Sequence, residues 1–94
     1  MEHAIIERLA TSNIQLVTET AAHFLFTRDN CIALVERREG TIGSTGILTD
    51  QGLAYLIWRD GQAFLKSKIA EVPAGEEQLA AVRKFSQDLA RALG

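Results

Sequence analysis

The dipeptide Asp60-Gly61 constrains the fold of this chain more than any other local feature. It separates two runs of strand-forming residues, and Asp-Gly suits both central positions of a type I′ turn, which matches the twist of a two-residue β-hairpin. With these residues in the turn, Trp58 lies opposite Ala63 and Tyr55 opposite Lys66. The sequence therefore predicts an antiparallel hairpin in this part of the chain.

A second hairpin is predicted around Asp29-Asn30, because Asp and Asn tolerate the positive φ of a tight turn. This register places Phe26 opposite Ala33 and His23 opposite Glu36. Both strands are largely apolar on two faces, whereas an antiparallel hairpin usually has one wet face. We therefore expect the second face of this hairpin to be covered by something.

The remaining strands are predicted from alternation and composition. Residues 47–69 read as a three-strand meander, and residues 53–58 are apolar on both faces, which is typical of a central strand. Residues 14–22 fit a strand or a helix, and we favour a strand up to residue 20.

Residues 40–46 contain three of the seven glycines and are expected to form a flexible loop, with an anion-binding nest as the alternative. Residues 72–75 are expected to be a linker.

Helices are predicted at both ends of the chain, over residues 1–12 and 76–93. The second has acidic residues in its first turn and Arg91 in its last, in agreement with the helix dipole. Its apolar stripe consists of Leu79, Val82, Phe85, Leu89 and Leu93. The predicted fold is a single α+β domain over 1–94, with one antiparallel sheet of about five strands flanked by an N-terminal and a C-terminal helix (α-β-β-β-β-β-α).

Charge and composition argue against several classes of partner. The net charge is −2 and the charges are interleaved, so no basic cluster indicates nucleic acid or an anionic membrane. No apolar run approaches the ~20 residues of a membrane span, and the first residues do not resemble a signal peptide. The single cysteine, Cys31, excludes an intramolecular disulfide and a cysteine-based metal cage. We expect no cofactor, no metal and a cytoplasmic location.

Two sets of residues suggest chemistry. His23 and Glu36 could form an acid–base pair of a small enzyme, although a polar cross-strand pair at the sheet margin is the more common arrangement. Tyr55 and Trp58, with nearby basic residues, could stack on the bases of a nucleic acid. Cys31 is read as a small buried apolar residue rather than a nucleophile.

The favoured interpretation is a small non-catalytic binding or regulatory module that acts as a homodimer. The chain has more two-faced apolar strand than two short helices can cover, so a second copy or another protein would hide the remaining face. The alternative is a sheet that curls around its own core. The expected interface draws on Leu25, Ile32, Leu34, Tyr55, Ile57, Trp58 and Phe64.

Overall fold

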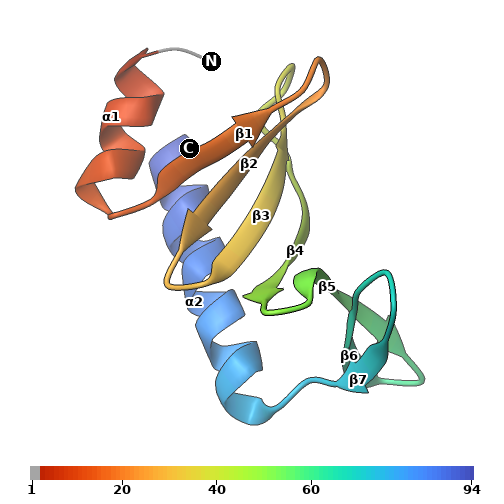
Figure 1. Ribbon diagram of the computed structural model, residues 1–94. Coiled ribbons are helices and arrows are strands. Elements are labelled where there is room, and N and C mark those ends of the chain that lie inside the picture. The colour runs from red at the N-terminus through yellow and green to blue at the C-terminus, as the bar shows by residue number, and fades with distance from the viewer. Residues whose placement is uncertain (1–2) are drawn as a thin grey trace.

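The computed structural model describes residues 3–94 as one antiparallel sheet with two helices (Figure 1). Each strand pairs with its neighbours in sequence, in the order β1-β2-β3-β4-β5-β6-β7. The elements are α1 (His3–Thr11), β1 (Gln15–Glu19), β2 (His23–Arg28), β3 (Cys31–Glu36), β4 (Ile42–Thr49), β5 (Gly52–Arg59), β6 (Gln62–Lys66), β7 (Glu71–Pro73) and α2 (Glu76–Leu93). The predicted α+β class is confirmed, but the sheet has seven strands rather than about five.

Both predicted hairpin turns are confirmed. Asp29 and Asn30 have φ angles of 51° and 67°, and Asp60 and Gly61 have φ angles of 54° and 77°. Positive φ at both central residues defines the type I′ turn. The strands pair in the predicted registers, including His23 with Glu36 and Trp58 with Ala63.

The ambiguous segment before the first hairpin is a strand, β1, with a register shift between Leu16 and Thr18. The turn that follows contains neither Gly nor Pro. Instead, the hydroxyl oxygen of Thr20 accepts hydrogen bonds from the N–H groups of Ala22 (3.3 Å) and His23 (3.0 Å). A threonine side chain thus closes this turn in place of a turn-forming backbone residue.

Three predicted boundaries are wrong. The expected loop at 40–46 is mostly strand. Strand β4 begins at Ile42, which pairs with Val35, and the pairing with β3 continues to Ile47 opposite Cys31. Only Gly40 among its three glycines has a positive φ, 70°. The strand expected to continue to residue 69 ends at Lys66, where Ser67 begins a turn. The expected linker contributes a short seventh strand, β7, which pairs with β6.

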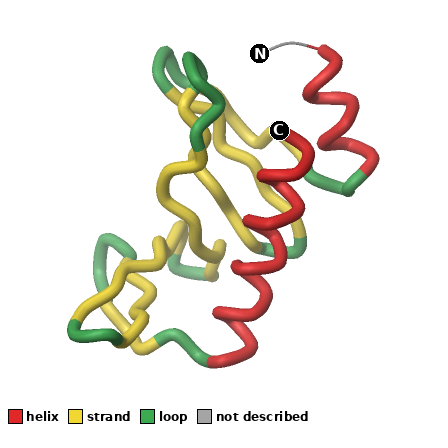
Figure 2. Tube along the Cα trace, turned by 180° about the vertical axis from the view of Figure 1, so that it is seen from behind, coloured by secondary structure: helices red, strands yellow, loops and turns green. Residues whose placement is uncertain are grey.

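The core lies between α2 and the sheet face that α2 crosses (Figure 2). Phe85 and Leu89 of α2 are almost completely buried there, as predicted from the helical period. They pack in a cluster with Val82 of the same helix, with alternate side chains of β2 and β3 and with both ends of the α1–β1 connection: Leu9, Ile14, Phe24, Phe26, Cys31, Ala33 and Val35. Neither helix has the length and apolarity of a membrane span within the described residues.

Arg28 joins β2 to both helical segments. Its guanidinium donates hydrogen bonds to the Asp88 carboxylate of α2 (2.8 Å) and to the Ser12 carbonyl oxygen after α1 (3.2 Å). It also lies 5.6 Å from the centre of the Phe85 ring. This largely shielded contact joins α2 and the end of α1 to one end of the first hairpin.

Candidate binding groove

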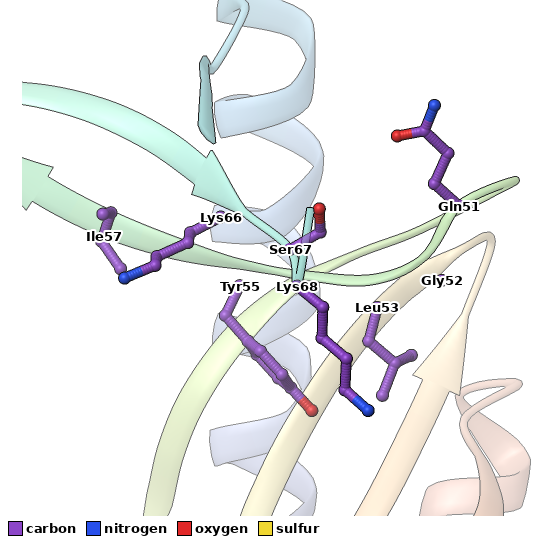
Figure 3. Close-up of a pocket in the computed structure, with 8 residues that line it drawn as sticks. All are labelled: Gln51, Gly52, Leu53, Tyr55, Ile57, Lys66, Ser67 and Lys68. Carbon is purple, nitrogen blue, oxygen red and sulfur yellow. The ribbon is translucent and has the colours of Figure 1, made fainter. Parts of the chain in front are cut away.

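A groove of about 580 Å³ lies on the face of the sheet that the helices do not cover. Its lining comes from β5, from the end of β6 and from the turns beside them: Gln51, Gly52, Leu53, Tyr55, Ile57, Lys66, Ser67 and Lys68. Figure 3 shows Leu53, Tyr55 and Lys68 extending in one direction, whereas Gln51 points away. The groove is therefore mainly apolar, with two ammonium groups.

The alternation of β5 produces the apolar floor of the groove. Leu53, Tyr55 and Ile57 project to one face of the strand, while Ala54 and Trp58 project to the other. The intervening Leu56 packs against the core cluster instead of lining the groove. Since successive residues point to opposite faces, a strand that is apolar throughout supplies both the core and the groove.

Gly46 of β4 lies directly opposite Tyr55. A Cβ atom at Gly46 would lie 2.0 Å from the carbonyl oxygen of Ala54 and 2.7 Å from the Cα of Tyr55. Only glycine permits this approach of the two backbones. Gly46 thus allows β5 to pass close to β4, where the lower part of the sheet turns away from β1–β3 (Figure 1).

Two lysines enter the groove from β6 and the turn that follows it. Lys66 is the register partner of Tyr55, as predicted. Lys68 lies in a turn held by Ser67, whose hydroxyl oxygen accepts hydrogen bonds from the N–H groups of Ile69 (3.3 Å) and Ala70 (3.2 Å). Neither lysine forms an ion pair with an acidic side chain in the part of the chain that the structure describes.

Tyr55 is a titratable residue of the groove whose pKa is changed by its surroundings. Burial raises the pKa of its phenol above the usual value, because the charged phenolate would lose solvation. The hydroxyl is therefore protonated at neutral pH and is available as a hydrogen-bond donor. The sequence singled out Tyr55 and Ile57 as interface residues, but it indicated Lys66 and Lys68 only as basic residues near Tyr55 and Trp58.

The expected interface residues do not form one surface. Leu25 and Ile32 lie on the face of the groove but are only 7% and 1% exposed within this chain. Leu34, Tyr55, Ile57 and Phe64 share that face and are half-buried. The sheet therefore covers part of its second face by itself, as in the curled arrangement considered as the alternative.

Trp58 lies on the opposite face from Tyr55 and is 60% exposed. The structure therefore does not bring the two aromatic side chains together on one face of the sheet. On its own face of the sheet, Trp58 lies opposite the buried Ala63. Val72 of the nearby strand β7 is half-exposed.

His23 and Glu36 lie opposite each other at the open end of the first hairpin, beside Arg37 and Arg38 in a shallow hollow. The described residues show no hydrogen bond or ion pair between these two side chains. Arg37 instead pairs with Glu19 (3.1 Å) and lies over the Phe24 ring. The structure brings His23 and Glu36 together in register without aligning them as a dyad.

Cys31 is 4% exposed, and burial raises the pKa of its thiol, an effect that Arg28 only partly opposes. A thiol in this state is a poor nucleophile, in agreement with its interpretation as a core residue. The described residues contain no group of three His, Cys, Asp or Glu side chains placed to hold a metal ion.

Comparisons of the chain with protein-family models, with curated proteins and with solved structures gave no match. What the domain does is therefore inferred from its own residues, and the groove on β5 and β6 is the feature that most resembles a site.

Proposed function

We propose that this domain is a small non-catalytic binding module that acts as a homodimer and holds an apolar ligand in the groove on β5 and β6. The groove itself carries the proposal. Its volume, about 580 Å³, falls in the range of small-molecule sites, and such sites combine apolar walls with a few polar groups.

The exposure of apolar side chains at the groove supports a ligand there. Leu53 is 36% exposed and the adjacent Leu48, its register partner, is 44% exposed. Both project to the same face as Tyr55. A ligand that covers these side chains would remove apolar surface from water, worth about 25 cal/mol per Å².

A binding role is better supported than catalysis. The polar groups of the groove are two ammonium groups, a protonated phenol and the Ser67 hydroxyl, whereas the Gln51 amide points away. The lining contains neither a carboxylate nor an imidazole, the side chains that most often act as general bases. The lone buried thiol of Cys31 also fits a reducing environment, so we keep a cytoplasmic location as part of the proposal.

The amount of exposed surface supports the homodimer. The chain exposes 6195 Å², whereas a compact monomer of 10.3 kDa exposes about 5,400 Å². The excess of roughly 800 Å² is similar to the area that each partner loses in a standard interface. A second copy of this chain is therefore the occupant that we propose for the remaining apolar surface.

We place the anchor of the homodimer at Trp58 and not in the groove. A two-fold contact through the groove would bring Lys66 and Lys68 of one copy toward the same residues of its partner, and like charges oppose such pairing. Trp58 is the residue of the expected interface that lies on the other face, and tryptophan is a frequent interface anchor.

Light scattering tests the homodimer at high micromolar concentration. The wild-type protein should have a mass of about twice 10.3 kDa, and the variant Trp58→Glu should have the monomer mass. Val17→Glu is the matched control, because Val17 is 56% exposed but lies on the distant edge strand β1. A monomeric wild type would show that the homodimer is wrong, whereas dimers of unchanged affinity for Trp58→Glu would show that Trp58 is not its anchor.

Titration with 1-octanol tests the groove, followed by the backbone amide shifts of the ¹⁵N-labelled protein. Shifts should concentrate on β5 and on the turn after β6. They should weaken strongly in Leu53→Asp but persist in Val17→Asp, which changes a more exposed apolar side chain on the distant strand β1. Shifts spread over the surface, or centred on the His23 hollow, would contradict the proposed site.

A further inference from the structure

We propose that the ligand of the groove is a small amphipathic anion, namely an aliphatic chain that ends in a carboxylate. This inference rests on the proposed function, in which the groove holds an apolar ligand, and it adds the charge and the shape of that ligand. The structure supports it through the charge of the lining, the donors that the lining presents and the length of the apolar floor.

The lining is positively charged. Two of its eight residues are lysines and none is acidic, although the chain as a whole has a net charge of −2. Several other cations of the described residues are neutralised by a neighbour: Arg28 pairs with Asp88, Arg37 with Glu19 and Arg59 with Glu71. Two ammonium groups beside an apolar floor favour an anion and disfavour a cation.

Hydrogen-bond donors in the groove fit a carboxylate. Lys68 and Tyr55 extend in the same direction in Figure 3, while Lys66 extends toward Ile57. The ammonium of Lys68 and the protonated hydroxyl of Tyr55 can each donate to one oxygen of a carboxylate. Lys66 adds positive potential along the floor.

The apolar floor fits an aliphatic chain. From Leu53 to Ile57 the strand spans about 13 Å, roughly the length of an extended chain of ten carbons. A free amphiphile suits this site better than a membrane surface does, because recognition of anionic membranes usually relies on clusters of four to eight basic residues. The groove has two.

Three ligands of equal chain length test the proposal: octanoate, 1-octanol and octylammonium, each below its micellar concentration. Octanoate should bind the wild-type protein at least tenfold more tightly than 1-octanol, and octylammonium should bind more weakly than both. The double variant Lys66→Gln/Lys68→Gln should lose this preference, because octanoate binding should weaken by at least tenfold relative to octanol binding. The control Arg38→Gln/Arg83→Gln removes the same charge from exposed residues outside the groove and should keep the preference.

The outcomes separate this inference from the proposed function. If octanol binds in the groove as tightly as octanoate, or octylammonium binds as tightly, the anionic ligand is wrong while the apolar binding site stands. If the charge-matched control loses the preference as well, overall charge explains it and the assignment to Lys66 and Lys68 is wrong. If none of the three ligands binds, both the inference and the binding site are wrong.

Discussion

Gly46 and Ala54 approach so closely that a Cβ on Gly46 would lie 2.0 Å from the carbonyl oxygen of Ala54. No side chain fits at this distance, so the packing of β4 against β5 depends on a single hydrogen atom in place of a methyl group. Because Tyr55 follows Ala54 directly, this approach also sets the position of the groove floor.

The variant Gly46→Ala should therefore be strongly destabilised, by about 3 kcal/mol, since the backbones must separate to admit the methyl group. Gly43→Ala is the control in the same strand, because its added Cβ would lie 3.5 Å from the nearest atom, an ordinary contact. It should change the free energy of unfolding by less than about 1 kcal/mol. Urea denaturation of both variants measures the difference, and equal effects would contradict this account.

Gly61 is needed for a different reason. A Cβ atom at this position would meet nothing within 4 Å beyond the adjacent residues, but the φ of 77° is strained for a β-branched residue. Gly61→Val should cost on the order of 1 kcal/mol or more in the free energy of unfolding. Asp60→Asn should be nearly neutral in the same denaturation experiment, because Asn accepts the φ of 54° at that position. A neutral Gly61→Val would be evidence against the type I′ turn.

Phe85 anchors α2 in the core and is 1% exposed. Phe85→Ala should lower the free energy of unfolding by about 3–5 kcal/mol, through lost burial and the cavity left behind. That loss is enough to unfold a domain of marginal stability. Gln87→Ala, on the exposed side of the same helix, is the control and should remain folded. Circular dichroism and thermal melting would compare the two, and a fully stable Phe85→Ala would count against the packing.

Asp88 predicts how stability depends on pH. The hydrogen bond from Arg28 is the main cause that holds the pKa of the Asp88 carboxyl below its usual value. The folded state therefore binds a proton at Asp88 less readily than the unfolded state does. The stabilisation that the ionised Asp88 gives to the folded state is complete above the unfolded pKa of about 3.9, and it disappears as pH falls through the lower pKa of the folded state. Asp88→Asn should be less stable than wild type at pH 7, with the difference shrinking toward pH 2. A difference that is independent of pH would exclude this ion pair as its source.

The burial of Cys31 predicts slow alkylation. Iodoacetamide at pH 8 should modify the thiol of the folded protein at least a hundredfold more slowly than in 6 M urea, because burial both raises its pKa and blocks access. Mass spectrometry of timed samples gives the two rates. Rapid modification of the folded protein would indicate that Cys31 is an accessible, reactive thiol and not a buried core residue.

The local parts of the fold could be predicted from the sequence because their causes are local. Asp29-Asn30 and Asp60-Gly61 determine both turn type and register, so every strand pair across them was predicted in the correct alignment. The start of β4 was missed because Ile42 becomes a strand residue by pairing with Val35 across a register shift, which is a tertiary contact that composition does not reveal. The three-residue β7 depends in the same way on its pairing with β6.

The groove was only half predictable. The alternation of β5 and the pairing of Tyr55 with Lys66 followed from the sequence, and they place an apolar row beside a cation. Lys68 enters the groove because β6 ends before it, at a turn where the residue pattern alone predicts a continued strand. Burial of Leu25 and Ile32 within the chain depends on how the sheet curves, which no local pattern determines.

Intermolecular nuclear Overhauser effects between octanoate and the labelled protein test the central claim most directly. The methylene protons of the ligand should show contacts with the side chains of Leu53, Tyr55 and Ile57, and none with the indole of Trp58 on the opposite face. Contacts with Trp58, or with the core side chains Phe85 and Leu89, would place the ligand elsewhere and contradict the assignment of the groove as the binding site.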